Sequence, residues 1–142
     1  MLQEVLRRVQ LRLPDDDGAG LPGVAARPDK KSHAGAVGVM QVMPKLAAAN
    51  PIHVPNVNDA DGNIHAGVKM MRNIGDTYFN NLGIDPLNKT LFTFAAYNAG
   101  PNRIVRLRDK AKDDGLDPNK WFGNVELEVA RAGNCDLRQQ YL

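Results

Sequence analysis

Residues 32–44 read Ser-His-Ala-Gly-Ala-Val-Gly-Val-Met-Gln-Val-Met-Pro, and our fold prediction starts from this stretch. Its first half consists mainly of small residues. Gly35 and Gly38 can adopt backbone angles closed to other residues, which suits a turn held against a ligand or a neighbouring helix. In the apolar second half, the amide of Gln41 must find hydrogen-bond partners, and Pro44 suits the first position of a helix. A buried loop-to-helix junction without a ligand is the alternative interpretation.

A second informative stretch lies much later in the chain, where residues 94–101 read Phe-Ala-Ala-Tyr-Asn-Ala-Gly-Pro. The pair formed by Gly-Val-Met-Gln and this Ala-Tyr-Asn-Ala-Gly resembles the motifs of the soluble lytic transglycosylase family, the goose-lysozyme-like enzymes that cut bacterial peptidoglycan. The resemblance runs from about Asp29 to Val129. It implies a lysozyme-like, predominantly helical α+β fold over 29–130, between an atypical leader (1–28) and an atypical tail (131–142).

Composition fits this class and excludes several others. The 142-residue chain has room for one domain, and its 43% hydrophobic and 24% charged residues are ordinary for a globular chain. A net charge of +2 does not favour nucleic acid, and no stretch is apolar enough for a membrane span. Residues 1–11 lack the apolar centre of an export signal. The single Cys135 and three scattered histidines exclude an internal disulfide and predict no metal site.

Apolar spacing and helix breakers predict a succession of helices with short turns. We expect them over 45–50, 62–82, 86–98 and 101–112, followed by one that Asp117-Pro118 opens, with a polar loop over 52–61. The second helix should present one apolar face made of Ile64, Val68, Met71, Gly75, Tyr78 and Leu82. The residues expected to point inward from the later helices are Leu87, Leu91, Phe94, Ala95, Ile104, Val105, Leu107, Trp121 and Phe122.

The helix expected over 101–112 carries five basic residues, which are Arg103, Arg106, Arg108, Lys110 and Lys112. Basic side chains on one short helix could contact the acidic stem peptides of a cell wall. A solvated face is the interpretation that the sequence favours, because the apolar residues of this helix already supply a buried side.

The family resemblance implies roles for five residues at a cleft. Ser32 would hydrogen-bond the substrate near its N-acetyl group, and Gln41 would bind or brace the sugar beside the catalytic acid. Met43 would form an apolar wall. Tyr97 would hold the acid or the reacting sugar through its hydroxyl, and Asn98 would fix the Tyr97 turn. Packing or helix capping is the alternative role for each of them.

The chemistry that the resemblance implies is cleavage of the bond between N-acetylmuramic acid and N-acetylglucosamine. In the family, one glutamate protonates the departing oxygen and then takes the proton of the 6-hydroxyl, which closes a 1,6-anhydro ring. No water is consumed and no cofactor is needed. The substrate is a peptidoglycan glycan strand, the expected location is the periplasm or cell envelope, and a monomer is expected.

The catalytic glutamate is absent from the printed sequence. By the spacing common in the family its position falls at Gly23, and Val24 stands where the family has serine. Glu4 is distant in sequence, Asp15 to Asp17 lie in an unpatterned segment, and Asp29 is on the wrong side. The chain as written therefore offers no credible general acid.

A shifted reading frame is one explanation. Residues 21–28 can be encoded as CTA CCA GGA GTC GCG GCT CGA CCA, and the same bases read from the second position give Tyr-Gln-Glu-Ser-Arg-Leu-Asp-Gln, with the family's Glu-Ser pair. Residues 132–142 can likewise be recoded to a sequence that resembles the family's closing helix. Both termini would then be out-of-frame translation around an authentic middle.

Three functional interpretations remain open from the sequence. The chain is a lytic transglycosylase domain impaired by the missing acid, or a non-catalytic remnant that binds glycan, or a chain that does not fold stably because its acid-bearing and closing helices are altered.

Overall fold

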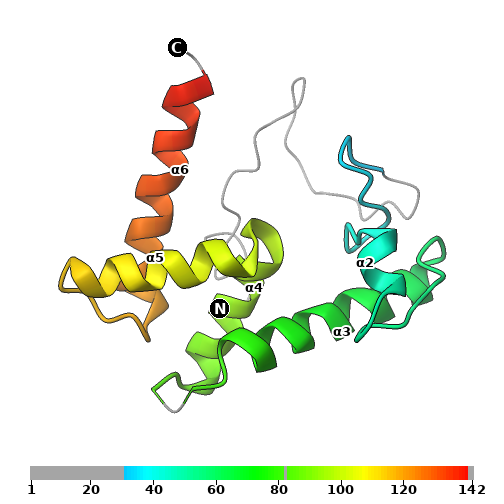
Figure 1. Cartoon of the computed structure of the whole chain (residues 1–142), viewed down its shortest axis with the longest axis horizontal. Helices are drawn as coiled ribbons and strands as arrows, with labels where there is room; N and C mark the ends of the chain where they lie inside the picture. The colour runs from blue at the N-terminus through cyan, green and yellow to red at the C-terminus, as the bar shows by residue number, and fades with distance from the viewer. Residues whose placement is uncertain (1–30, 82, 141–142) are drawn as a thin grey trace. The chain divides into compact units, whose positions relative to one another are not determined.

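The computed structural model describes residues 31–81 and 83–140, with side chains to 133. The Gly23 position, Asp29, Leu82 and the whole expected leader therefore lie outside the described residues. The helices follow in the order α2 (Pro44–Ala48), α3 (Ala60–Tyr78), α4 (Pro86–Ala99), α5 (Pro101–Asp113), the irregular turn η1 (Trp121–Val125) and α6 (Glu126–Gln140) (Figure 1).

The predominantly helical class is confirmed. Apart from helices, the backbone pairing found within the described ranges is two isolated antiparallel bridges, Lys31–Val37 and Val37–Val42. These bridges do not make a sheet, so the α+β part of the expected fold stays a prediction. The described residues form two compact units, and the boundary along the chain falls between Asn73 and Ile74. They are called here the N-terminal unit and the C-terminal unit.

The predicted helix starts are largely confirmed, because they depend on local chemistry. Pro44, Pro86 and Pro101 each open a helix. The Asp85 side chain caps α4 by accepting from the Asn88 backbone N–H at 2.9 Å. Gly100, with φ of 91°, separates α4 from α5. The ends of α3 were predicted less well, since the helix begins at Ala60 and stops at Tyr78, four residues before Leu82.

The core of the C-terminal unit is built around three aromatic rings. The rings of Phe79 and Phe92 stack at 5.6 Å between centroids, and Trp121 meets Phe92 edge-on at 5.8 Å. The guanidinium of Arg108 lies 5.0 Å from the centre of the Phe92 ring and donates to the Pro118 carbonyl at 2.7 Å. Arg108 therefore braces the core, and the prediction that it belongs to a solvated face is wrong.

Several large apolar residues lie on the opposite side from the one predicted. Ile64 and Val68 are 45% and 55% exposed, Tyr78 is 37% exposed, and Leu87 is 61% exposed. The buried side of α3 uses small residues instead: Ala66 is fully buried, and a Cβ on Gly67 would lie 2.8 Å from Met40. The loop that contains Met40 packs closely against these small residues.

The helix predicted after Pro118 begins later than expected. Phe122 has extended backbone angles and Gly123 has a φ of 69°, so the chain bends between Trp121 and α6. Trp121 is buried as predicted, whereas Phe122 is 39% exposed because the bend directs it outward. α6 continues to Gln140, through most of the segment expected to be an atypical tail.

α6 is joined to α5 through a buried carboxylate. Glu128 is 1% exposed and forms ion pairs with Lys110, 3.0 Å from Nζ to Oε2, and with Arg131. Lys110 also donates to Asp114 Oδ2 at 2.6 Å, and this hydrogen bond raises the pKa of Lys110 and lowers that of Asp114. Lys110, expected on a solvated face, therefore has two acidic partners.

The N-terminal unit has its own small core, to which the segment 52–57 contributes. Ile52, Val54 and Val57 are each at most 7% exposed, although the sequence predicts a polar loop there. They pack with a cluster formed by Val37, Val42, Ala47 and Ala66. The polar residues between them face solvent, so composition alone did not distinguish this segment from an exposed loop.

We predict that Phe92→Ala lowers the free energy of unfolding by about 3–5 kcal/mol, because it removes the ring shared by Phe79, Trp121 and Arg108. Leu87→Ala, on the exposed side of the same helix, should change it by no more than about 0.5 kcal/mol. Urea unfolding followed by circular dichroism measures both. Equal losses in the two variants would contradict this description of α4.

Candidate functional site

The Gly-Val-Met-Gln motif forms a tight turn between two paired residues. Val37 and Val42 exchange backbone hydrogen bonds of 2.9 and 3.0 Å, and residues 38–41 form the loop between them. The Gln41 N–H closes this loop on the Gly38 carbonyl at 3.1 Å. Positive φ angles at Gly38 (75°) and Gln41 (49°) give the turn its direction. The sequence prediction of a turn is therefore confirmed.

Asn63, in the first turns of α3, holds this motif in place. Its amide nitrogen donates to the Val37 carbonyl at 2.8 Å and to the Val57 carbonyl at 3.0 Å, while its amide oxygen accepts from the Met40 N–H at 2.8 Å. The side chain is 1% exposed. One buried amide thus satisfies three backbone groups from two separate segments, which fixes the turn against the helix.

Gly38 is required at its position for two reasons. Its φ of +75° disfavours any residue with a side chain, and an added Cβ would lie 2.3 Å from the Asn63 amide nitrogen. The close approach that the sequence suggested for this glycine is thus confirmed, and its partner is a neighbouring helix.

Gln41 lies on the exposed side of the turn. Its side-chain nitrogen donates to the Gly38 carbonyl at 2.8 Å, which supplies a partner of the kind that the sequence required. The side chain is therefore oriented from within the turn. An oriented amide at a solvent-facing position is a chemically suitable group for hydrogen-bonding a sugar.

Ser32 and Met43 flank this turn. The Ser32 hydroxyl accepts from the Ala36 N–H at 3.0 Å, and the Ser32 N–H donates to the Ala36 carbonyl at 2.8 Å. Met43 is half-buried and takes the position just before α2. Ser32 thus makes a local structural contact, and the binding roles of Ser32 and Met43 stay predictions.

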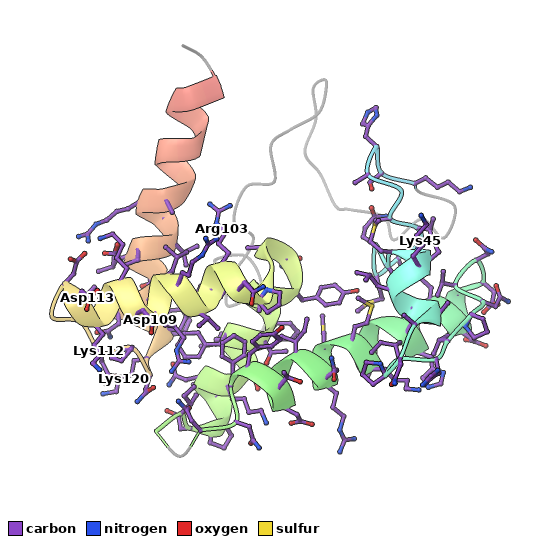
Figure 2. The ribbon with its side chains drawn as sticks, viewed as in Figure 1. Lys45, Arg103, Asp109, Lys112, Asp113 and Lys120 are labelled. Atoms are coloured by element: carbon purple, nitrogen blue, oxygen red, sulfur yellow. The ribbon has the colours of Figure 1, made fainter. Side chains whose placement is uncertain are left out.

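Tyr97 and Asn98 occupy the last turn of α4 in the C-terminal unit, as predicted. Burial raises the pKa of the Tyr97 phenol above its ordinary value, which is already well above neutral pH, so the hydroxyl is protonated at neutral pH. Asn98 is exposed. The stick view in Figure 2 follows this helix end into α5, where Arg103 is labelled.

The predicted site residues thus fall into two groups. Ser32, Gln41 and Met43 belong to the N-terminal unit, and Tyr97 and Asn98 are neighbours in the C-terminal unit. The sequence analysis missed Asn63. The only sequence signal for Asn63 was its spacing: it precedes the small residues Ala66 and Gly67 by three and four positions, so all three lie on one side of α3.

No group of three His, Cys, Asp or Glu side chains in the described ranges is arranged to hold a metal ion. Over the same ranges, no helix combines the length and apolarity needed to cross a membrane.

The fold and the two motifs define a small, predominantly helical domain with a helix-anchored Gly-Val-Met-Gln turn and a Tyr-Asn helix end. Comparison with known families then identifies it: the model of the Transglycosylase SLT domain matches residues 25–120, and the chain belongs to this family. The match contains both motifs and begins two positions after Gly23.

Curated relatives agree with this assignment. The chain is 33% identical over 100 residues to "Membrane-bound lytic murein transglycosylase F" of Desulfosudis oleivorans, which covers 70% of this chain and 21% of that protein. The protein of the same name from Stutzerimonas stutzeri is 34% identical over 96 residues, 68% of this chain and 19% of its own length. The chain thus spans about a fifth of the length of these relatives. No solved structure shows significant similarity to it.

We predict that Asn63→Ala lowers the free energy of unfolding by about 2 kcal/mol or more, because three buried backbone groups lose their partner. Asn58→Ala removes an exposed amide nearby and should have little effect. Thermal melts of both variants measure the difference. A stable Asn63→Ala variant would show that the turn does not depend on this amide.

The two glycines of the motif allow a second prediction. Gly35→Ala meets no atom within 4 Å and should cost about 1 kcal/mol, from the positive φ alone. Gly38→Ala adds the clash with Asn63 and should cost clearly more. Denaturant unfolding of the pair separates backbone strain from the steric contact, and equal costs would argue against close packing at Gly38.

Proposed function

We propose that the chain derives from a peptidoglycan lytic transglycosylase domain and that it is catalytically impaired as written. The reaction would cleave the bond between N-acetylmuramic acid and N-acetylglucosamine and form 1,6-anhydro-N-acetylmuramic acid. The domain would extend over 29–130. The observation that carries the proposal is the family match across both motifs, together with a Gly-Val-Met-Gln turn that is held rigidly by α3.

The proposed substrate-binding residues are Ser32, Gln41, Met43, Tyr97 and Asn98, each in the role that the family resemblance implies. Two properties support these roles. The Gln41 amide is exposed and oriented by its bond to Gly38. The Tyr97 phenol is protonated at neutral pH, as a phenol with an ordinary pKa is, and burial raises its pKa further, so it can donate to a carboxylate or to a sugar oxygen.

Impairment follows from the missing proton donor. A glycosidic oxygen needs a proton to leave, and a positioned acid typically contributes about a hundredfold or more to the rate. Gly23 has no side chain to supply this proton. The family match begins at residue 25, so the Gly23 position lies outside it. Codons incompatible with the recoding of residues 21–28 would eliminate the frameshift hypothesis.

Relatives named as membrane-bound murein transglycosylases support a location in the cell envelope, and a peptidoglycan glycan strand as partner. We propose that the domain acts there as a monomer. No cofactor is required by the reaction.

We predict that replacing residues 21–28 by Tyr-Gln-Glu-Ser-Arg-Leu-Asp-Gln raises the release of 1,6-anhydro products from purified sacculi about a hundredfold or more over the printed chain. The added glutamate supplies the proton that Gly23 cannot. Product release is measured by chromatography with mass detection.

The matched control is the same replacement with glutamine in place of the new glutamate, which should restore the segment without restoring activity. Tyr97→Phe in the restored chain should lower turnover while leaving the fold intact. Robust turnover by the printed chain would show that another carboxylate serves as the acid and would contradict the proposed impairment.

A non-catalytic glycan-binding remnant is the second candidate function. It is favoured by the fact that the turn is braced entirely by residues of the described chain, so the sugar-binding groups persist without the acid. This candidate would be supported over an enzyme if both the printed and the restored chain were retained on sacculi and neither released product.

A further inference from the structure

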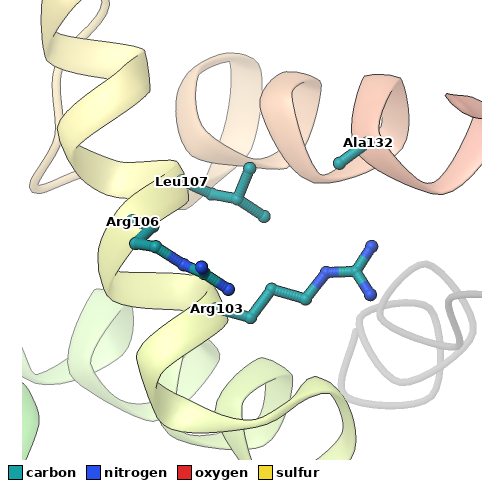
Figure 3. A pocket seen from close by; sticks show the side chains of 4 residues that line it. All are labelled: Arg103, Arg106, Leu107 and Ala132. Atoms are coloured by element: carbon teal, nitrogen blue, oxygen red, sulfur yellow. The ribbon is translucent and has the colours of Figure 1, made fainter. Parts of the chain in front are cut away.

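The C-terminal unit has a pocket of about 350 Å³ that is lined, among the described residues, by Arg103, Arg106, Leu107 and Ala132 (Figure 3). Arg103 has an interaction partner, so its charge is not reserved for a ligand. The N-terminal unit holds a more specific feature, which is a strained residue on the exposed side of the Gly-Val-Met-Gln turn. This residue is Gln41, which the proposed function places beside the sugar.

Gln41 has a backbone conformation that its own side chain does not account for. Its φ of 49° lies in the left-handed region, which residues other than glycine seldom adopt. Such a conformation costs free energy and persists only where the surrounding structure enforces it. The Gln41 side chain is exposed, so its burial is not what enforces the conformation. Contacts of the preceding residue supply such a constraint.

The preceding residue, Met40, is contacted by α3 in two ways. The Asn63 amide oxygen accepts from the Met40 N–H at 2.8 Å. Gly67 is buried, and an added Cβ at this position would lie 2.8 Å from the Met40 Cβ. Asn63 and Gly67 are four residues apart, so they lie on the same face of the helix. Together they hold Met40 by its backbone and by its side chain.

Little freedom remains between these contacts and Gln41. The loop consists of residues 38–41 and is closed by the paired backbone hydrogen bonds of Val37 and Val42. The Gln41 side-chain nitrogen also donates back to the Gly38 carbonyl at 2.8 Å. In a closed loop this short, the backbone angles of the neighbouring residues absorb any shift of Met40, because peptide planes and bond angles are stiff. A displaced Met40 therefore changes the direction of the Gln41 amide.

We propose that Asn63 and Gly67 are positioning residues, which set the direction of the Gln41 amide and through it the affinity of the chain for a glycan. Both are buried, so they act through Met40 and not by touching the sugar. An amide held in its binding direction loses less freedom when the ligand arrives, which favours binding. The glycan as ligand rests on the proposed function, whereas the positioning of Gln41 does not.

Gly67→Ala is the first test variant, because its Cβ displaces Met40 while alanine favours the helix. Gly75→Ala is the matched control. It makes the same change at a buried position of the same helix, and its Cβ would lie 2.9 Å from the Thr93 hydroxyl instead of meeting Met40. Asn63→Ala is the second test variant, since it removes the hydrogen bond to Met40, and it is studied below its melting transition.

The first readout needs no ligand. In isotope-labelled chains, nuclear magnetic resonance should show the side-chain amide signals of Gln41 shifted in Gly67→Ala and in Asn63→Ala, and unchanged in Gly75→Ala. A purely structural role of α3 would lower the melting temperature and leave these signals of the folded chain in place.

The second readout is calorimetric titration with a peptide-free tetrasaccharide of alternating N-acetylglucosamine and N-acetylmuramic acid. Gly67→Ala should raise the dissociation constant about fivefold, as expected for one lost hydrogen bond, and Gly75→Ala by less than about twofold. In a Gln41→Ala background, Gly67→Ala should have no further effect, because its influence passes through Gln41.

The outcomes separate this inference from the proposed function. Gln41 signals that stay in place in both test variants, or that shift equally in Gly75→Ala, overturn the positioning role whatever the glycan does. An equal loss of affinity with and without Gln41 also overturns it, because α3 would then act by another route. If neither the printed nor the restored chain binds or cuts glycan while the Gln41 signals still depend on Asn63 and Gly67, the proposed function is overturned and the positioning of Gln41 is supported.

Discussion

The three hydrogen bonds of the buried Asn63 amide are the constraint on which the N-terminal unit depends. They join the Val37 carbonyl, the Met40 N–H and the Val57 carbonyl to the start of α3. A buried backbone group without a partner is costly, so the turn can lie against the helix only because this side chain replaces the missing backbone partners. Gly38 completes the arrangement by leaving room for the amide.

The C-terminal unit is stabilised differently, by aromatic packing and by charges that are partly withdrawn from solvent. Phe79, Phe92 and Trp121 form the centre, and Arg108 covers it while bonding the loop before η1. Glu128 then connects α6 to α5 through Lys110 and also pairs with Arg131 of its own helix. Arg108 and Lys110, two of the basic residues of α5, therefore serve the packing of this unit.

The structure and the family assignment bear on function in different ways. Membership of the Transglycosylase SLT domain family links both motifs to a murein-cleaving class. The described residues add two separate features: in the N-terminal unit, a turn that presents Gln41, and in the C-terminal unit, a half-buried Tyr97 phenol that is protonated at neutral pH. Under the proposed function, restoring residues 21–28 allows the contribution of the acid and that of the binding residues to be measured separately in one protein.

Local chemistry allowed the sequence alone to determine much of this protein: the helical class, the prolines that start α2, α4 and α5, the break at Gly100, and the presence of a turn at Gly38. These features depend on residues close together in the chain. Tertiary structure alone decided which sides of α3 and α4 are buried, because the packing partner determines whether Ile64 or Ala66, Leu87 or Phe92, faces the core. It also decided the role of Asn63, since an amide becomes an anchor only when Val37 and Val57, 26 and 6 residues away, are folded against it.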